Sequence, residues 1–259
     1  MLKQKLTKAF IYRSILWDLS LKQFKAKYSG SFLGIWWAVI IPLLLTVCID
    51  FVFSHLYKVN IENFALFILA GMVPWIFFSN ALSEATTSFV GNSSLLKQTI
   101  FPREFIPLST AIANFLNFGL GFLFLLPLFI VLHPKVILIT PLFILVLFFH
   151  FLFLAGLSLF FSTLDIFFRD LSHFLSIAFM MWFWITPVFY SIDMLDFSYR
   201  WIPLMNPVSY YTILYQDILF KAISPRLSVI GTAFSLGVFF FISGYLFFLK
   251  LEVKLLKRL

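Results

Sequence analysis

The sequence predicts an all-α membrane protein with an N-terminal amphipathic interfacial helix, six transmembrane helices and short re-entrant helices between the fifth and sixth spans. Hydrophobic residues make up 62% of the 259 residues and charged residues only 12%, which leaves too few charges for the surface of a soluble domain. The apolar runs are long and do not alternate with polar residues, as the strands of a membrane β-barrel do. We therefore predict a single transmembrane domain, residues 1–259.

The first element is a helix predicted over residues 2–28, a segment without Gly or Pro. Its apolar residues form two stripes on opposite sides, with most lysines between them; the first includes Trp17, Leu21, Phe24 and Tyr28, and the second Ile11, Ile15 and Leu19. A basic helix with an aromatic face is typical of the membrane interface, and the second stripe indicates packing against this chain or a partner. The simpler interpretation is a basic flank that only sets the topology. A cleaved signal peptide is excluded because the basic segment and the following apolar run are too long and no Ala-x-Ala site follows.

Six apolar runs are long enough to cross the membrane, since a spanning helix needs about 20 such residues. The predicted spans are residues 32–54, 64–83, 105–132, 136–163, 171–190 and 227–249. Prolines inside them are tolerable, because neighbouring helices can satisfy the freed backbone carbonyls.

The basic residues predict the orientation of these spans. Fourteen of the 19 Lys and Arg residues fall on the side of the termini, and the other side holds only five: Lys58, Lys135, Arg200, Lys221 and Arg226. Loops rich in Lys and Arg face the cytoplasm. Both termini are therefore predicted to be cytoplasmic in a multi-pass protein of the inner (plasma) membrane.

The segment 197–220 is apolar enough to enter the membrane but is a poor lipid-facing span, because it contains Pro203, Asn206, Pro207, Gln216 and Asp217. A seventh spanning helix would also move the basic C-terminal tail to the outer side. We predict a pair of short re-entrant helices, since irregular backbone at membrane depth is allowed where protein or water covers it. An interfacial loop is the alternative.

Motifs for catalysis, nucleotide binding and metal binding are missing from the sequence. No glycine is followed by lysine, so there is no Gly-x-x-x-x-Gly-Lys loop for ATP. Cys48 is the only cysteine, and the four histidines show no ligand spacing, so no metal site is predicted. No carboxylate falls clearly at mid-membrane, which disfavours a proton-coupled carrier. The net charge of +8 reflects membrane topology rather than nucleic-acid binding.

The loop 91–104 is the most structured of the connections. Asn92 or Ser93 can cap a short helix, which Pro102 would end. Such a helix would lie against the membrane with Leu95, Leu96 and Ile100 able to engage a partner; a surface turn with buried leucines is the alternative.

Several short motifs, taken in order, resemble the permeases of type-2 ABC exporters, and most closely the branch that exports O-antigen, capsule and teichoic-acid polysaccharides. They are Lys27-Tyr-Ser-Gly-Ser-Phe-Leu-Gly-Ile-Trp-Trp37, Pro42, Phe51-Val-Phe53, Gly71-Met-Val-Pro-Trp-Ile-Phe-Phe-Ser79, Asn92-Ser-Ser-Leu-Leu-Lys97, Phe101-Pro-Arg-Glu104, Phe167-Phe-Arg-Asp170, Thr186-Pro-Val-Phe-Tyr190, and Trp201 with Met205-Asn-Pro207. Trp36 departs from the Leu or Phe common at its position.

The resemblance implies a permease without its own ATP site. Two copies would pair with two ATPase subunits that bind ATP and Mg²⁺, forming a channel for a lipid-linked polysaccharide such as that of lipopolysaccharide biosynthesis. It implies a coupling helix at residues 92–99 and an outer gate at residues 197–220. The implied coupling residues are Asn92, Ser94, Leu95, Leu96, Lys97, Phe101, Pro102, Arg103 and Glu104. The implied gate residues are Trp201, Asn206, Pro207, Tyr210 and Tyr211.

Aromatic residues are abundant, with 38 Phe, 9 Tyr and 7 Trp, and sugar rings stack on aromatic faces. We expect channel-lining residues among Trp75, Phe78, Trp182, Trp184, Phe189 and Tyr190; lipid-belt or core packing is the alternative for each. A substrate entrance is expected at Tyr28, Gly30, Gly34, Trp36 and Trp37, with the two glycines on one helix face permitting close backbone approach.

Two other functions remain as alternatives. A stand-alone ion-coupled flippase of lipid-linked sugars would need a mid-membrane titratable group and no ATPase. An intramembrane glycosyltransferase or hydrolase would need paired carboxylates or a metal site, and the sequence indicates neither.

Overall fold

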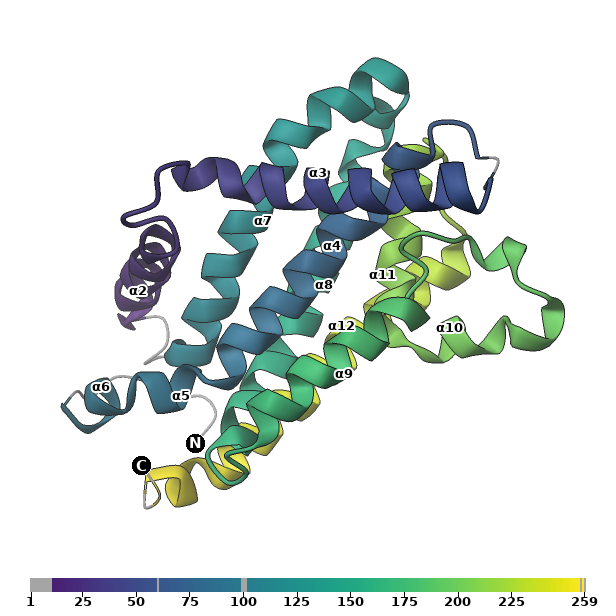
Figure 1. Ribbon diagram of the computed structural model, residues 1–259. Coiled ribbons are helices and arrows are strands. Elements are labelled where there is room, and N and C mark those ends of the chain that lie inside the picture. Colours follow the sequence, from purple (N-terminus) through teal and green to yellow (C-terminus); the bar gives the residue numbers. More distant parts are fainter. Residues whose placement is uncertain (1–10, 60, 99–101, 257, 259) are drawn as a thin grey trace.

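The computed structural model describes residues 11–59, 61–98, 102–256 and 258, and every regular element in these ranges is helical (Figure 1). Five segments in the described part are long and apolar enough to cross a membrane. They are Gly34–Leu56, α4 (Phe64–Thr86), α7 (Phe105–Leu132), α8 (Val136–Asp165) and α12 (Leu227–Leu256). A sixth apolar helix, α9 (Leu171–Ile185), is shorter. These helices confirm the predicted fold class.

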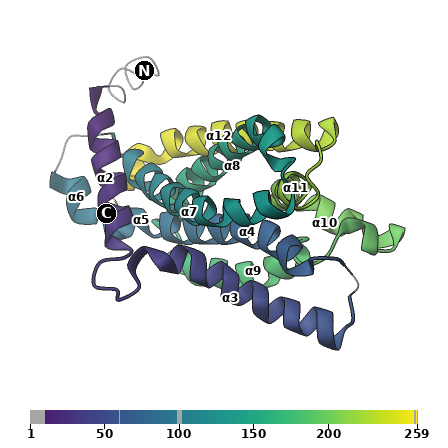
Figure 2. The same ribbon diagram turned by 90° about the horizontal axis from the view of Figure 1, so that it is seen from above.

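The long helices run between two ends of the molecule. One end, which we call the basic end, carries α2 (Arg13–Ala26), α5 (Ser88–Gly91), α6 (Ser93–Gln98) and the last turns of α12 (Figure 1). The opposite end carries the short elements between α9 and α12. Seen from above, α3 (Trp37–Asp50) and α12 lie on opposite faces, with α4, α7 and α8 between them (Figure 2).

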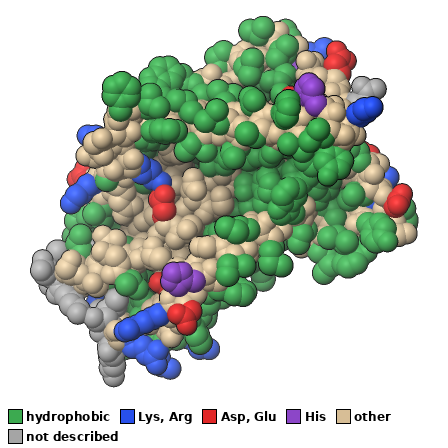
Figure 3. All heavy atoms as spheres, in the orientation of Figure 1, with side chains coloured by type: hydrophobic (Ala, Val, Ile, Leu, Met, Phe, Trp, Pro, Cys, Tyr) green, Lys and Arg blue, Asp and Glu red, His purple; other side chains and the backbone are tan. Residues whose placement is uncertain are grey.

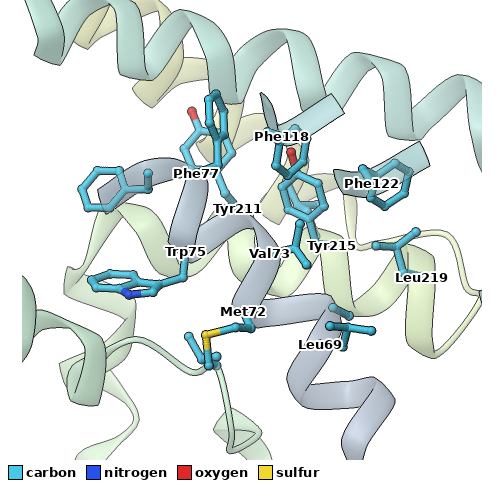
Figure 4. Packing of buried hydrophobic residues seen from close by; sticks show 14 of the residues in the cluster. Leu69, Met72, Val73, Trp75, Phe77, Phe118, Phe122, Tyr211, Tyr215 and Leu219 are labelled. Atoms are coloured by element: carbon cyan, nitrogen blue, oxygen red, sulfur yellow. The ribbon is translucent and has the colours of Figure 1, made fainter. Parts of the chain in front are cut away.

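Helix α4 is the centre of this arrangement. Of its most apolar 18-residue window, 78% is buried, whereas the other four spans have 17% to 28% buried. It contacts α3, α7, α8, α9 and α11 (Pro207–Tyr215), so it has almost no lipid-facing side. Figure 4 shows its residues Leu69 to Phe77 packed against Phe118 of α7 and the tyrosines of α11.

The first span differs from the predicted 32–54 at its start. A 3-10 turn, η1 (Gly34–Trp36), leads into α3, and a π-helical turn, η2 (Phe51–Leu56), ends it. Gly30 and Gly34 have φ angles of 77° and 52°, and open space surrounds both. The expectation that they lie on one helix face for close packing is therefore wrong, because they form the left-handed turn between α2 and α3, which favours glycine.

Helix α9 ends at Ile185, so the predicted span 171–190 is too long. Thr186 is extended with ψ 131°, as expected for a residue before proline, and Pro187 has no N–H to continue the helix. Fifteen residues of helix measure about 22 Å, which is less than the roughly 30 Å of a hydrocarbon core.

The predicted re-entrant region is a succession of short helices. After η3 (Ile192–Met194) and η4 (Phe197–Tyr199) come α10 (Trp201–Met205), α11 and the π-helical turn η5 (Gln216–Phe220). Helix α11 packs against α4, α8 and α12, whereas α10 projects from the body at the end opposite the basic end (Figure 1).

Helices α8 and α12 form the most extensive helix pair, and glycines bring their backbones together. A Cβ atom added at Gly156 would overlap the carbonyl oxygen of Phe240, and one added at Gly244 would overlap that of Gly156. Small residues at such crossings are how membrane helices gain close packing.

We therefore expect Gly156→Ala to destabilise the protein by about 3 kcal/mol, because the backbones of α8 and α12 must separate. Thermal unfolding of the purified chain in detergent measures this loss. Gly231→Ala on α12 is the matched control, since a Cβ atom there meets nothing within 4 Å, and it should be neutral or slightly stabilising. Equal melting temperatures for the two variants would contradict the glycine contact.

Candidate translocation site

A cluster of polar side chains joins α2, α4 and α7 at the basic end. Lys27 Nζ lies 2.6 and 2.7 Å from the two carboxylate oxygens of Glu84 and donates to Asn114 Oδ1 at 2.8 Å. Asn114 Nδ2 in turn donates to Glu84 at 2.8 Å. The Tyr28 hydroxyl donates to Asn117 Oδ1. We call these five residues the entrance cluster.

The entrance cluster stands between solvent and the interior. The Lys27 side chain is 20% exposed and that of Glu84 is 44% exposed, so water reaches the ion pair. Burial raises the pKa of the Tyr28 phenol, and the negative charge of Glu84 raises it further. The Tyr28 hydroxyl therefore stays protonated and remains a donor to Asn117.

The face of α2 that packs on α7 is polar. Ser20 is buried, and Gln23 Nε2 donates to Ser109 Oγ of α7 at 3.0 Å.

Trp17, from the predicted membrane stripe, is exposed, while Ile15 and Leu19 of the second stripe are half-buried. The expectation that the second stripe packs against this chain or a partner stays a prediction, and the polar side of α2 meets α7 through the hydrogen bond of Gln23. Helix α2 lies across the long helices in Figure 2, as an interfacial helix would, and residues 2–10 of the predicted helix lie outside the described residues.

A polar strip of α4, which includes Glu84 of the entrance cluster, faces outward. Asn80, Ser83, Glu84 and Thr87 are exposed and share one helix face by their spacing. Figure 3 shows a hollow in this region of the surface, between α3 and α9. A crevice between α3, α4 and α7, lined by Asn80, Asn114 and Asn117, has a volume of about 20 Å³, which is room for about one water molecule.

The expected aromatic residues separate into buried and exposed groups. Trp75, Phe78 and Phe189 are buried in the core of the chain, so the expectation that they line a channel is contradicted for this structure: α4 is covered on nearly all sides. Trp184 is 62% exposed. Tyr190 is half-buried, and its hydroxyl donates to the carbonyl oxygen of Ile185.

At the entrance, Trp36 and Trp37 are exposed at 53% and 38%. Trp36 packs on Phe124 of α7, with ring centroids 5.1 Å apart. Trp37 donates to Ser31 Oγ at 3.1 Å, which holds its indole over the α2–α3 turn. These tryptophans therefore offer exposed apolar surface at the α2–α3 turn and beside α7.

At the opposite end, Asn206 fixes the elbow between α10 and α11. Its Oδ1 accepts from Trp182 Nε1 at 2.7 Å and from the backbone N–H of Val208 at 3.0 Å, and its Nδ2 donates to Thr186 Oγ1 at 2.8 Å. Asn206 thus caps α11, whose first residue is Pro207. The same side chain joins the elbow to the last turn of α9.

Two tyrosines and Gln216 fasten α11 and η5 to the body. The buried Tyr211 hydroxyl donates to Ala233 O of α12 at 2.8 Å, and the Tyr215 hydroxyl lies 3.3 Å from His150 Nδ1 of α8. Gln216 Nε2 donates to Pro187 O and Val188 O. Gly71 of α4 lies beside it, and a Cβ atom added at Gly71 would lie 2.9 Å from Gln216 Nε2.

Tyr210 is half-buried and Trp201 is exposed. Of the gate residues implied by the sequence, Asn206 and Tyr211 therefore anchor the region, and Trp201 lies on its surface.

The segment 92–99, predicted to couple to an ATPase, contains α6, which directly follows α5. The carbonyl of Asn92 accepts from the N–H groups of Leu95 and Leu96, so it begins α6. Leu96 is 5% exposed and packs with Phe89, Ile106, Leu159, Ile166, Phe248 and Leu255 in a separate core at the basic end. The expectation that the Leu96 side chain engages a partner is therefore wrong. Ser94 on the same helix is exposed.

The other residues of this segment lie close to α12 or outside the described part. Arg103 is 3.6 Å from Glu252 of α12, Glu104 is buried, and Pro102 is half-buried. Ile100 and Phe101 lie outside the described residues, and Lys97 lies on α6. Among the residues that the structure describes, no three His, Cys, Asp or Glu side chains come together as a metal site would require.

A model of the ABC-2 type transporter family matches residues 15–220. The chain belongs to this family. It is similar to two O-antigen export system permease proteins of Klebsiella pneumoniae. The first is 31% identical over 90% of this chain and 90% of the relative. The second is 30% identical over 98% of this chain and 97% of the relative. An O-antigen export system permease protein of Myxococcus xanthus is 31% identical over 81% of this chain and 82% of the relative. The chain is thus a multi-pass membrane protein of the ABC-2 type.

The region matched by the ABC-2 family runs from α2 to the end of η5, so it includes the entrance cluster, the α4 strip, α6 and Asn206. Sequence reasoning did not select Lys27, Glu84, Asn114 or Asn117 as a group. A signal was available, because Asn80, Ser83, Glu84 and Thr87 in one span and Ser109, Thr110, Asn114 and Asn117 in the next recur at helical spacing.

We expect Asn206→Ala to destabilise this ABC-2 type chain by about 2–4 kcal/mol, because α11 loses its cap and the Trp182 indole N–H loses its acceptor. Thermal unfolding in detergent measures the change. Asn92→Ala removes a single side-chain bond, from Asn92 Nδ2 to Ser88 O, and should cost about 1 kcal/mol or less. If Asn206→Ala melts no lower than Asn92→Ala, the elbow does not depend on Asn206.

Proposed function

We propose that this chain is the channel-forming permease subunit of an ATP-driven exporter, which moves a lipid-linked, O-antigen-like polysaccharide from the cytoplasm across the inner membrane. The observation that carries the proposal is the similarity, over 81% to 98% of the chain, to three permeases named for O-antigen export. The working unit would contain two copies of this chain and two ATPase subunits. ATP and Mg²⁺ would bind to the ATPase subunits.

The distribution of charge supports a cytoplasmic location for the basic end. Lys22, Lys25 and Lys27 of the α2 region lie there, as do the α8–α9 turn, which contains Arg169, and Lys254 and Arg258 beside that turn, and Lys/Arg-rich loops face the cytoplasm. Helix α2 then lies in the cytoplasmic interface, and the entrance cluster sits where a lipid-linked substrate first meets the protein. The re-entrant helices lie on the outer side.

The hollow over α4 suits a hydroxyl-rich chain. A desolvated hydroxyl costs several kcal/mol unless it finds a hydrogen-bond partner, and Asn80, Ser83 and Thr87 offer such partners along one face of α4. The exposed indoles of Trp36 and Trp37 at the start of α3 and of Trp184 on α9 supply flat apolar surface on the two helices that flank the hollow. Two copies with their hollows facing each other would enclose a path with polar and aromatic walls.

Coupling to ATP would run through α6. The separate core of Phe89, Leu96, Ile106, Leu159, Ile166, Phe248 and Leu255 ties α5 and α6 to α7, α8 and α12. A force on the exposed side of α6 is therefore passed to three spanning helices at once. ATP-driven closure of the partner subunits is a motion of the kind that can supply this force.

We expect Ser94→Trp to abolish co-purification with the co-expressed ATPase while the permease still elutes as a folded species, because the bulky indole stands on the exposed face of α6. Affinity purification followed by size-exclusion chromatography measures both properties. Ser198→Trp at the opposite end is the matched control and should retain the ATPase. Leu96→Asp should instead lower the yield of folded permease, since it buries a carboxylate. Normal ATPase capture by Ser94→Trp would exclude α6 as the docking element.

We expect Ser83→Leu to reduce surface polysaccharide about tenfold, because the strip loses a hydrogen-bonding group worth on the order of 1.4 kcal/mol. Immunoblotting of cells that also carry the ATPase gene measures export, and pulldown verifies that the complex still forms. Ser235→Leu, on the exposed face of α12, is the matched control and should export normally. Export that continues when the ATPase gene is deleted would favour a stand-alone ion-coupled flippase.

A further inference from the structure

A groove lies at the basic end, between the last turns of α8, the α8–α9 turn and the last turns of α12. Its volume is about 680 Å³. Five apolar residues form most of its wall, and two cationic residues complete it: Leu164, Phe167, Phe168, Phe247 and Leu251, with Lys254 and Arg258. No transport step described above uses these residues. The groove belongs to the α8–α12 pair, and α12 lies on the face opposite α3 (Figure 2).

The two cations stand on one side of the groove. Lys254 lies in the last turn of α12 and Arg258 lies beyond the end of that helix, and both line the groove. The Arg258 guanidinium lies over the Phe167 ring, 5.1 Å from its centroid, which orients the charge by a cation–π contact. No acidic residue is among those that line the groove, and Glu252 of the same helix is 3.6 Å from Arg103 instead. The described residues that line the groove therefore include two cations and no anion.

The position of the groove along the helices matches the boundary of a membrane. Phe247 and Leu251 lie on the apolar part of α12, and Lys254 is in its last turn. An occupant would thus place an apolar portion along α8 and α12 and an anionic portion at the level of Lys254 and Arg258. Basic pockets between membrane helices on the cytoplasmic side bind anionic lipid headgroups.

We propose that this groove binds an anionic phospholipid of the surrounding bilayer, with its phosphate at Lys254 and Arg258 and an acyl chain against Phe168, Phe247 and Leu251. The bound lipid would brace the ends of α8 and α12 against the turn that starts α9. The proposal does not depend on which substrate the protein exports.

The test uses the full-length chain in zwitterionic detergent with phosphatidylglycerol or phosphatidylethanolamine as probes. Native mass spectrometry counts retained lipids, and thermal unfolding reports stabilisation. We expect preferential retention of phosphatidylglycerol and a higher melting temperature in its presence. In Lys254→Gln/Arg258→Gln the preference should fall about thirtyfold, since each cation near an anionic lipid contributes roughly a factor of five.

Three further measurements distinguish binding at this site from a general effect of positive charge. Lys22→Gln/Lys25→Gln removes two exposed cations of α2 and should keep the preference. Leu251→Trp keeps both cations but fills the groove, so it should lose the retained lipid while its elution profile stays unchanged. Glycerol 3-phosphate, which has the anion without the acyl chain, should not raise the melting temperature.

The proposal fails if Lys254→Gln/Arg258→Gln retains phosphatidylglycerol as the unaltered chain does. Stabilisation by glycerol 3-phosphate equal to that by the lipid would identify a simple anion site and overturn the lipid assignment. The same measurement on the complex with its ATPase gives a third outcome: loss of the lipid there would mean that a protein partner covers the groove.

Discussion

The burial of α4 is the constraint on which the rest of the structure depends. A spanning helix without a lipid-facing side needs neighbours all around it, and α3, α7, α8, α9 and α11 supply them. Its apolar half, from Phe64 to Phe78, is almost completely buried, so the aromatic residues there serve packing. Only the half toward the basic end leaves one side uncovered. That side is where Asn80, Ser83 and Glu84 lie, because a polar side chain is cheaper in a hollow than against lipid.

The scarcity of water inside a membrane also explains the form of the re-entrant region. Backbone that leaves the helical pattern at membrane depth needs protein partners for its polar groups. Pro187 O and Val188 O, which follow the broken end of α9, accept from Gln216, and Asn206 satisfies the first turn of α11. Amide side chains thus satisfy backbone groups both at the end of α9 and at the start of α11. The elbow and the end of α9 therefore form one hydrogen-bonded unit.

The helices could be predicted from the sequence largely because the length of an apolar run is a one-dimensional property. The predicted bounds of 105–132 coincide with α7, and the other long helices begin or end within a few residues of their predictions. Which side of a helix meets a neighbour is a property of three dimensions. Trp75 and Phe78 therefore could not be told apart from Trp184 by composition, although only Trp184 is exposed.

Glycine shows the same difference between pattern and packing. Gly30 and Gly34 have the four-residue spacing typical of helix contacts but form a turn with positive φ. Gly156 and Gly244, 88 positions apart in the chain, make the real close contact. Sequence spacing cannot reveal such a crossing, because it depends on how two separate helices meet.

These attachments divide the molecule into a body and two edges. Helices α8 and α12 are locked by their glycines, and α11 is fastened to α4, α8 and α12 by Tyr211, Tyr215 and Gln216, so these elements move together. Helices α3 and α9 flank the hollow and contact the body over less of their surface, with large apolar side chains such as Leu44 and Met180 exposed. Because Asn206 joins α9 to the elbow, a displacement of α9 that widens the hollow also pulls on α10. The width of the hollow and the position of α10 are therefore linked through Asn206, while Gln216 joins η5 to the same end of α9.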